Sequence, residues 1–367
     1  MLLVAWQNVR RQPGRFAASA GAVAVAVLLA LFVSGLYLGL LDSIIEYPRS
    51  LPGDVVVAEE GASVIMIRSS SRLPTDTERV VAAVPGVAGV TPLYGRMVWF
   101  DVRGREALAF LVGLYTTDVE GGPPRMLEGH ARPRVDELVV DRVLAAEFGL
   151  RVGDPFEQFG ARLRVGGIAA GGNAMVGTYA FVHRGALLLA GVGTPSYLFV
   201  HTAPGADPAA VAQAIDALPG VAAYTRARFL EKNQALARQV VLPIIGVMLA
   251  VCLVIGATFA GLALYTQTVE RRREFGTLLA VGLSRRQVYA TVLLQSAIVT
   301  VVGLLAGLAG AAGLSRLLVA LQPRYVTVVP LWLTGAVAAA TVVVGVVAAL
   351  VPVRLLARLD VAQVMRA

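Results

Sequence analysis

The chain holds few of the side chains on which active sites and metal centres depend. Its 367 residues contain one lysine, Lys232, and one cysteine, Cys252. Lys232 lies outside any Gly-x-x-x-x-Gly-Lys-Ser/Thr loop, and a single cysteine excludes an internal disulfide and a cysteine-based metal site. The three histidines, His130, His183 and His201, form no i, i+4 pair. No Ser/His/Asp order is present either, so we expect no catalytic residue, no metal and no enzyme activity.

Charge is also scarce, because charged residues make up 15% of the chain against about 25% in soluble domains. The deficit is concentrated in four apolar runs, each longer than the ~20 residues that a helix needs to cross a bilayer. We therefore predict an α-helical four-span bundle with 1 + 3 topology and a large α+β extracytoplasmic domain between spans 1 and 2. The predicted boundaries are a cytoplasmic interfacial helix at 1–15, span 1 at 16–41, the extracytoplasmic domain at 42–239, span 2 at 240–268, a cytoplasmic helix at 269–287, span 3 at 288–320, an outer loop at 321–327, span 4 at 328–353 and a cytoplasmic tail at 354–367.

The distribution of arginine predicts the orientation. Residues 1–15, 269–287 and 354–367 hold eleven arginines and three acidic residues, which accounts for the whole net charge of +8. The positive-inside rule then places both termini and the 269–287 segment in the cytoplasm, with the large domain outside. Because that domain is neutral, the basic pI reflects topology, and a nucleic-acid partner is not expected.

The first fifteen residues predict a short helix on the inner membrane surface. Trp6 would lie at the level of the headgroups, beside Arg10, Arg11 and Arg15. The alternative is a frayed tail. The apolar run that follows is far longer than the 7–15 residues of a signal-peptide core, so we interpret it as an uncleaved anchor.

Small residues recur in the predicted spans. Gly35 and Gly39 in span 1, and Gly303 and Gly307 in span 3, have the small-x-x-x-small spacing that permits close helix contact. Four helices are too few to enclose a pore, so we expect a dimer with Gly35 and Gly39 at the subunit contact; a chance spacing is the alternative. The span cores lack ionisable residues, which polar-solute pathways usually contain.

The extracytoplasmic segment contains an internal repeat. TERVVAAVPGVAGVT at 77–91 matches VAQAIDALPGVAAYT at 211–225, and each predicts a helix, a Pro-Gly turn and a short strand. Two βαβ-like units, about 54–114 and 195–226, would flank an insert at about 116–193; the alternative is a chance match between two segments rich in alanine and valine. Within the insert, 138–148 predicts a strand running into a helix that Gly149 ends, and 156–168 predicts a strand pair. Segments 41–47 and 226–239 predict helical connectors to spans 1 and 2.

The charged stretch VERRREFGTLLAVGLSRRQV at 269–288 predicts a short amphipathic helix followed by a new helix start. Gly282 fits a helix-ending glycine, and Ser284 with Gln287 forms a capping box for span 3. Two interpretations compete: the arginines bind anionic lipid, or the helix docks into a cytoplasmic protein. Glu270 and Glu274 favour docking, since lipid binding gains nothing from acidic residues.

Four segments resemble one family. ERRREFGTLLAVGLSRRQV resembles the coupling segment of ABC-transporter permeases of the FtsX/MacB superfamily, the type VII ABC systems. AWQNVRRQPGRF resembles the family's beginning, and VPVRLLARLDVAQVMRA resembles its end, with Val361 in place of the usual proline. The segment DELVVDRVLAAEFGLRVGDPFEQFGARLRVGGIA resembles the family's periplasmic core domain.

The resemblance implies a half-transporter of the bacterial inner or plasma membrane that works as a homo- or heterodimer with a separate ABC ATPase. That ATPase would bind ATP and Mg; this chain would bind no cofactor. The implied cargo is a lipid, lipoprotein, peptide or drug, and an adaptor or membrane-fusion protein is a further partner in such systems. The alternative is an FtsX-like transducer that regulates a cell-wall hydrolase. The implied coupling surface consists of Glu270, Arg271, Arg272, Arg273, Glu274, Phe275, Gly276, Leu278, Ala280 and Gly282.

Overall fold

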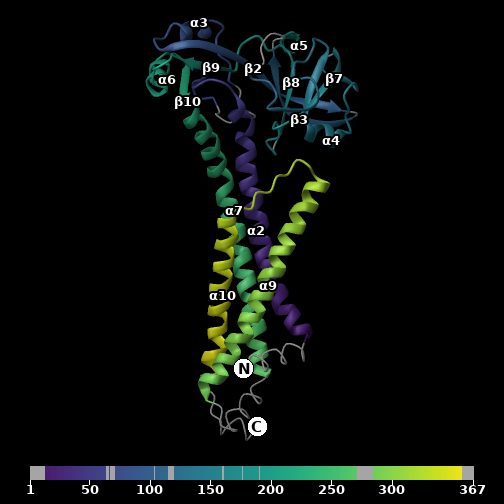
Figure 1. Ribbon diagram of the computed structural model, residues 1–367, viewed down its shortest axis with the longest axis vertical. Coiled ribbons are helices and arrows are strands. Elements are labelled where there is room, and N and C mark those ends of the chain that lie inside the picture. Colours follow the sequence, from purple (N-terminus) through teal and green to yellow (C-terminus); the bar gives the residue numbers. More distant parts are fainter. Residues whose placement is uncertain are drawn as a thin grey trace. The chain divides into compact units, whose positions relative to one another are not determined.

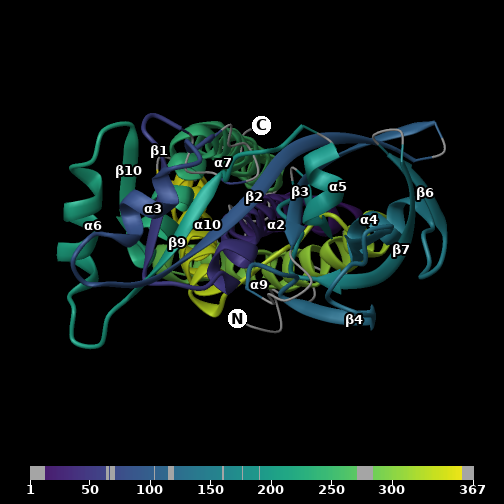
Figure 2. The ribbon, with the colours of Figure 1, turned by 90° about the horizontal axis from the view of Figure 1, so that it is seen from above.

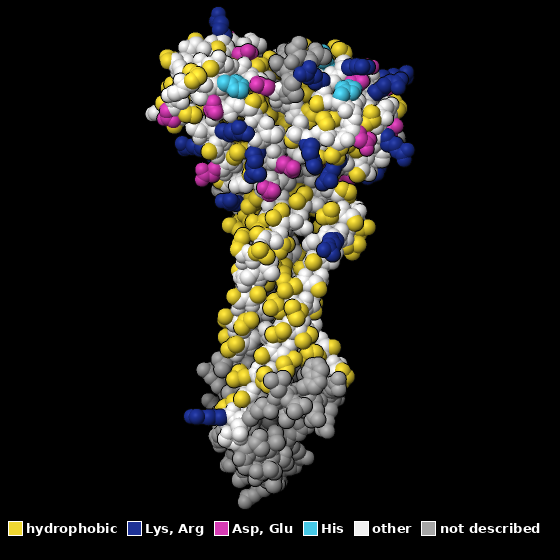
Figure 3. Space-filling model, in the orientation of Figure 1, with side chains coloured by type: hydrophobic (Ala, Val, Ile, Leu, Met, Phe, Trp, Pro, Cys, Tyr) yellow, Lys and Arg dark blue, Asp and Glu magenta, His cyan; other side chains and the backbone are white. Residues whose placement is uncertain are grey.

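The computed structural model describes residues 13–62, 66, 71–102, 104–114, 120–158, 161–175, 177–189, 191–270 and 284–357. The chain divides into two compact units. We call Met1–Leu38, Leu242–Ala320 and Thr327–Ala367 the helical unit, and Gly39–Val241 with Leu321–Val326 the sheet unit. Figure 3 shows mainly apolar side chains on the visible helices of the helical unit, whereas basic and acidic side chains are interspersed on the visible face of the sheet unit.

Four long helices supply most of the described residues of the helical unit (Figure 1). They are α2 (Pro13–Ser50), α7 (Arg226–Glu270), α9 (Arg285–Leu321) and α10 (Leu331–Ala357). Among the described residues, Phe16–Ser50 and Leu293–Leu321 are long and apolar enough to cross a membrane, and Leu331–Val347 is a shorter apolar helix. Two candidate spans therefore stand, and the four-span topology stays a prediction.

Helices α2 and α9 pack closely through glycines. A Cβ atom on Gly303 would lie 2.6 Å from the Cβ of Val23, and one on Gly307 would lie 2.6 Å from the Cβ of Val27. Both contacts are shorter than any side chain tolerates, so the glycines allow the two backbones to approach. The close helix contact predicted for Gly303 and Gly307 is confirmed, and it occurs within one chain.

Gly35 has an intrachain neighbour as well. Its carbonyl accepts a hydrogen bond from the Val328 N–H at 2.9 Å, and a Cβ at Gly35 would lie 2.7 Å from Val329 Cγ2. The segment that precedes α10 thus packs against this glycine. The contact explains Gly35 without a second subunit, and the subunit contact at Gly35 and Gly39 stays a prediction.

The sheet unit is built on a ten-stranded sheet with the order β10-β1-β9-β2-β3-β8-β5-β7-β4, and β6 pairs with β7. The strands are β1 (Val55–Glu59), β2 (Val87–Val102), β3 (Arg105–Leu114), β4 (Arg125–Gly129), β5 (Glu137–Asp141), β6 (Pro155–Gln158), β7 (Ala161–Ala170), β8 (Thr178–His183), β9 (Tyr197–Thr202) and β10 (Val221–Thr225). Short helices are α3 (Thr77–Ala82), α4 (Arg142–Phe148), α5 (Arg184–Leu189) and α6 (Pro208–Asp216).

The two repeated segments interleave in one half of this sheet. Each folds as a helix, a Pro-Gly turn and a strand, and the turn glycines Gly86 and Gly220 both have positive φ, at 88° and 76°. Strand β9 of the second unit lies between β1 and β2 of the first, and β1 lies between β9 and β10. This βαββαβ order is the split arrangement of ferredoxin-like folds. Helices α3 and α6 bury Val81, Val211 and Ile215 against the strands.

The boundary of the insert differs from the sequence prediction. Strand β2 pairs with β9 over 87–93 and with β3 over 94–102, so one continuous strand serves both halves of the sheet. Figure 2 shows β2 passing from the β9 side to the β3 side. The second part of β2 and all of β3 therefore belong to the inserted half, not to the first unit. No turn interrupts β2 at this point, so strand periodicity could not reveal the change of partner.

The inserted half combines parallel and antiparallel pairs. Strand β3 is parallel to β8 and β5 is parallel to β7, while β2·β3, β5·β8, β4·β7 and β6·β7 are antiparallel. The predicted strand and helix at 138–148 are confirmed as β5 and α4, and Gly149 ends α4 with φ 63°. The predicted strand pair at 156–168 is confirmed as β6 and β7.

Candidate functional site

Most of the coupling surface that the resemblance implies lies outside the described residues, which resume at Ser284. Trp6, Arg10 and Arg11 lie outside them as well. The capping box at the start of α9 is described: the Ser284 N–H donates to Gln287 Oε1 at 2.9 Å, and the Gln287 N–H donates to the Ser284 carbonyl at 2.9 Å. The predicted helix start is confirmed, while the docking surface stays a prediction.

The structure contains a second candidate site, in the connection between α9 and α10. Arg324 forms a two-pronged ion pair with Glu147 of α4, with 2.9 Å from Nε to Oε1 and 2.6 Å from Nη2 to Oε2. The Arg324 and Glu147 side chains are 22% and 15% exposed. Paired guanidinium–carboxylate bonds of this kind are directional and strong. Both residues belong to the sheet unit.

Asn173 holds the backbone of the same connection. Its Nδ2 donates to the Arg324 carbonyl at 2.7 Å, and its Oδ1 accepts from the Met175 N–H at 3.1 Å. Met175 has a positive φ of 58°, an uncommon conformation that this local side-chain bond supports. We call Glu147, Asn173 and Arg324 the loop seat, because together they fix both the side chain and the backbone of Arg324.

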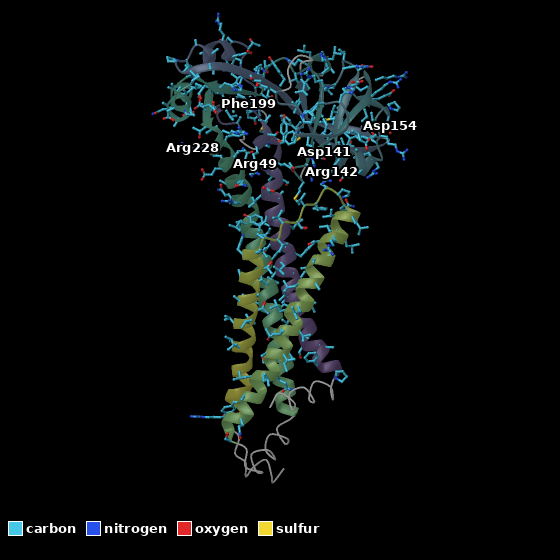
Figure 4. All side chains as sticks on the ribbon, in the orientation of Figure 1. Arg49, Asp141, Arg142, Asp154, Phe199 and Arg228 are labelled. Atoms are coloured by element: carbon cyan, nitrogen blue, oxygen red, sulfur yellow. The ribbon has the colours of Figure 1, made fainter. Side chains whose placement is uncertain are left out.

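Asp141 binds both α4, which carries Glu147, and the turn that carries Asn173. Its Oδ1 caps α4 by accepting from the Val143 N–H at 2.8 Å, and its Oδ2 accepts from the Gly172 N–H at 2.9 Å. One carboxylate thus orients the helix that carries Glu147 and the turn that carries Asn173. Asp141 is 1% exposed. Burial raises its pKa to about 6, despite these two hydrogen bonds. Figure 4 shows Asp141 at the start of α4, beside Arg142.

A neighbouring acidic group lies on α2. Glu46 lies near the end of α2, and the charges of Asp42, Arg142, Arg125 and Arg49 act on its carboxyl group. Glu46 also contributes to the raised pKa of Asp141. The end of α2 therefore shares an electrostatic environment with the base of the loop seat.

Helices α2 and α7 each insert an aromatic ring into the core of the sheet unit. Tyr47 on α2 is 0% exposed, donates to the Gly121 carbonyl at 2.6 Å and lies 4.1 Å from the Tyr179 ring centroid. Phe229 on α7 is 1% exposed, and its ring lies 6.1 Å from that of Tyr197. All four rings belong to one core cluster. The ends of both helices are therefore packed parts of the sheet unit, not flexible linkers.

The histidines make local contacts. His130 Nε2 lies 2.5 Å from Glu137 Oε2, and His201 Nε2 lies 3.4 Å from Glu120 Oε2. His183 Nδ1 accepts from the Gly185 N–H. In the part of the chain that the structure describes, no group of three or more His, Cys, Asp or Glu residues could hold a metal ion.

Comparison with known families covers both units. The model for the MacB-like periplasmic core domain matches residues 16–218, and the model for the FtsX-like permease C-terminal domain matches residues 246–361. This chain belongs to the FtsX/MacB family of ABC transporter permeases. The first match includes α2 and most of the sheet unit, and the second includes the coupling segment that the sequence indicated.

Two curated relatives match most of this chain, and two solved structures match about half of it. An uncharacterized ABC transporter permease of Mycobacterium tuberculosis is 26% identical over 367 residues, which is 98% of either chain. A second one from this organism is 27% identical over 322 residues, covering 86% of this chain and 84% of the relative. The periplasmic region of MacB from Actinobacillus actinomycetemcomitans matches 49% of this chain and 92% of that structure, with 14% identity and a TM-score of 0.36. The extracellular domain of YknZ from Gram-positive bacteria matches 47% of this chain and 100% of that structure, with 13% identity and a TM-score of 0.35.

The loop seat was not found from the sequence of the permease. Glu147 and Arg324 are 177 positions apart, and no local pattern connects them. One signal was present: Arg324 is the only charged residue between Arg316 and Arg354. A lone charge in so apolar a segment indicates a specific partner, although it does not say which acidic residue supplies it.

Proposed function

We propose that the permease couples ATP binding and hydrolysis by a separate ABC ATPase to movement of its sheet unit. The observation that supports this most strongly is the continuity of α2 and α7, each of which contains residues of both units. Tyr47 and Phe229 fix the ends of these helices in the core of the sheet unit. A displacement of either helix along its axis would therefore be transmitted to the sheet.

Helix α7 has one feature that would allow bending. Pro243 lies inside it, directly after the position at which the two units divide. Proline removes one main-chain hydrogen bond and crowds the preceding turn, so it marks the place where a helix bends most readily. In this proposal α2 transmits displacement and α7 bends at Pro243.

The proposed setting is a bacterial inner or plasma membrane, with four spans, both termini inside and the sheet unit outside. The arginine distribution and the two candidate spans support it. The permease would act as a homo- or heterodimer, and its partner ATPase would hold ATP and Mg. The proposed cargo is hydrophobic or amphipathic: a lipid, a lipoprotein, a peptide or a drug.

Variants at Glu274 and Phe275 test whether the permease is coupled to its ATPase. The permease and its ATPase are reconstituted in nanodiscs, and ATP hydrolysis with and without the permease is compared. Glu274→Lys and Phe275→Ala are expected to abolish the effect of the permease on hydrolysis and to reduce co-purification of the ATPase. Glu157→Lys, an exposed change in β6, is the matched control and should have no effect.

Full co-purification and unchanged hydrolysis in both coupling variants would overturn the proposal. Capture experiments with the whole permease address the FtsX-like alternative. Recovery of a cell-wall hydrolase, with unchanged lipid and drug phenotypes after gene deletion, would assign the permease to signalling instead of transport.

A further inference from the structure

A pocket lies where the two halves of the sheet meet. Its volume is about 590 Å³, and residues 71–72, 95–97, 191–194 and Ser196 line it. Residues 95–97 follow directly after the point at which β2 changes its partner from β9 to β3. Small-molecule sites concentrate at such junctions, and this volume falls within their range of ~300–1,000 Å³.

The charge around this pocket is positive. Arg72 and Arg96 line it, both are exposed, and none of its lining residues is acidic. The Arg72 N–H donates to Glu59 Oε2, which places one carboxylate nearby but outside the lining. Apolar surface is provided by Met97 and Val192. The lining therefore combines two guanidinium groups with an apolar side.

A third arginine lies directly behind the lining. Arg184 is 4% exposed, and it donates from Nη1 to the Val192 carbonyl at 2.6 Å and from Nη2 to the Gly193 carbonyl at 3.1 Å. Its guanidinium carbon lies 3.6 Å from the Tyr94 ring centroid. Among the described residues, its Nε has no hydrogen-bond partner and no carboxylate lies within ion-pair distance. A buried cation without a counter-charge is costly for a protein.

The same bonds bias the pocket toward anions. Because Arg184 engages the carbonyls of Val192 and Gly193, two acceptors of this loop are already in use. The N–H groups of Gly193 and Thr194 donate to none of the described residues, so they remain available as donors. Backbone N–H groups and arginines together form the donor set that binds phosphate and carboxylate groups.

We propose that this pocket binds a phosphate or carboxylate group, which supplies Arg184 with the counter-charge that none of the described residues provides. Arg72 and Arg96 contact the anion from the rim, and the 191–194 loop contacts it from the floor. Met97 and Val192 offer surface for an attached apolar chain. The anion is either free in solution or the head group of an amphipathic molecule. The inference concerns binding alone and does not depend on transport.

The experiment measures binding to the full-length permease in phosphatidylcholine nanodiscs by isothermal titration calorimetry. Three soluble probes separate the sources: hexyl phosphate, inorganic phosphate and hexanol. Hexyl phosphate should bind saturably and hexanol should not bind. Tighter binding of hexyl phosphate than of inorganic phosphate assigns the site to an amphipathic ligand, and equal binding assigns it to a free anion.

Variants locate the site. Arg72→Gln and Arg96→Gln should each weaken hexyl phosphate binding by about tenfold, the effect of losing one charge-assisted hydrogen bond. Gly193→Leu keeps every charge but fills the pocket, and nothing lies within 4 Å of a Cβ added there. It should abolish binding while the permease stays folded. Arg162→Gln, at an arginine outside the lining on β7, is the matched control and should bind like wild type.

Three results would overturn the proposal: no saturable binding of either anion, hexanol binding as tightly as hexyl phosphate, or unchanged binding in the three pocket variants. Thermal unfolding of each variant in the same nanodiscs verifies the fold. Because no ATPase is present, a negative result would leave the coupling proposal unaffected, and failed coupling would leave a positive binding result intact.

Discussion

Two buried or half-buried arginines of the sheet unit differ in how their positive charge is compensated. Arg324 meets Glu147 through two hydrogen bonds and is 22% exposed, so its charge is balanced within the protein. Arg184 is 4% exposed, and its contacts among the described residues are two carbonyls and the Tyr94 ring. An arginine that pairs with a carboxylate holds two segments together, whereas an arginine for which the described residues provide no carboxylate suits the anion site proposed above.

Removal of the Asp141 carboxylate should cause the largest loss of stability, because it disrupts the loop seat. It should not change the pocket. Asp141→Ala removes the cap of α4 and the acceptor of the Gly172 N–H, at a cost of about 2–4 kcal/mol in the free energy of unfolding. Thermal unfolding measures the loss. The matched control is Asp207→Ala at the α6 cap, where a single bond to the Ala209 N–H is lost, at about 1 kcal/mol. Equal losses in both variants would contradict the role given to Asp141.

The same carboxyl makes the loop seat sensitive to pH. Burial raises the pKa of Asp141 to about 6 from its ordinary value of 3.8, so the folded protein binds more protons than the unfolded chain between these two pH values. Stability from this group is complete below the lower value and is lost as pH rises through about 6. Relative to Asp141→Asn, the wild type should lose up to about 3 kcal/mol between about pH 4 and pH 7. Denaturant unfolding at several pH values measures the difference, and a difference that grows in the opposite direction would refute the assignment.

A double-mutant cycle isolates the ion pair itself. Glu147→Gln and Arg324→Gln should each destabilise the sheet unit, and the double variant should lose less than their sum, with a coupling energy of about 1–3 kcal/mol. The Arg162–Glu157 pair, whose side chains are 91% and 72% exposed, serves as the control cycle. Its coupling should stay below about 1 kcal/mol. Additive losses at the loop seat would show that Arg324 and Glu147 do not act as a unit.

Binding of hexyl phosphate should have the smallest effect on stability. Only variants of the pocket should change this effect. Hexyl phosphate at ten times its dissociation constant should stabilise the permease by about 1.4 kcal/mol through binding to the folded state. Thermal shift assays measure this gain. At the same ligand concentration it should fall to about 0.4 kcal/mol in Arg72→Gln, whose binding is about tenfold weaker, and stay near 1.4 kcal/mol in Glu147→Gln. A gain in Arg72→Gln equal to that of the wild type would place the ligand elsewhere.

The features that sequence patterns predicted are those encoded by residues close together in the chain. The capping box at Ser284 and Gln287, the close contact at Gly303 and Gly307, and the strand, helix and Gly149 of 138–149 each follow from local spacing. The Glu147–Arg324 pair and the pocket depend on which distant strands become neighbours. Even the insert boundary depends on that, since β2 changes partners without a change in its own conformation.

The register of β1 and β10 has a consequence for how this architecture can be varied. Val55 pairs with Thr225, and the Arg226 N–H donates to the Asp54 carbonyl at 2.8 Å. The chain therefore enters and leaves the ten-stranded sheet at adjacent points, a few residues after α2 ends and directly before α7 begins. A domain whose ends meet can be exchanged as a cassette. The strands and loops between these two ends can thus be replaced, shortened or enlarged without a change in the distance between the end of α2 and the beginning of α7.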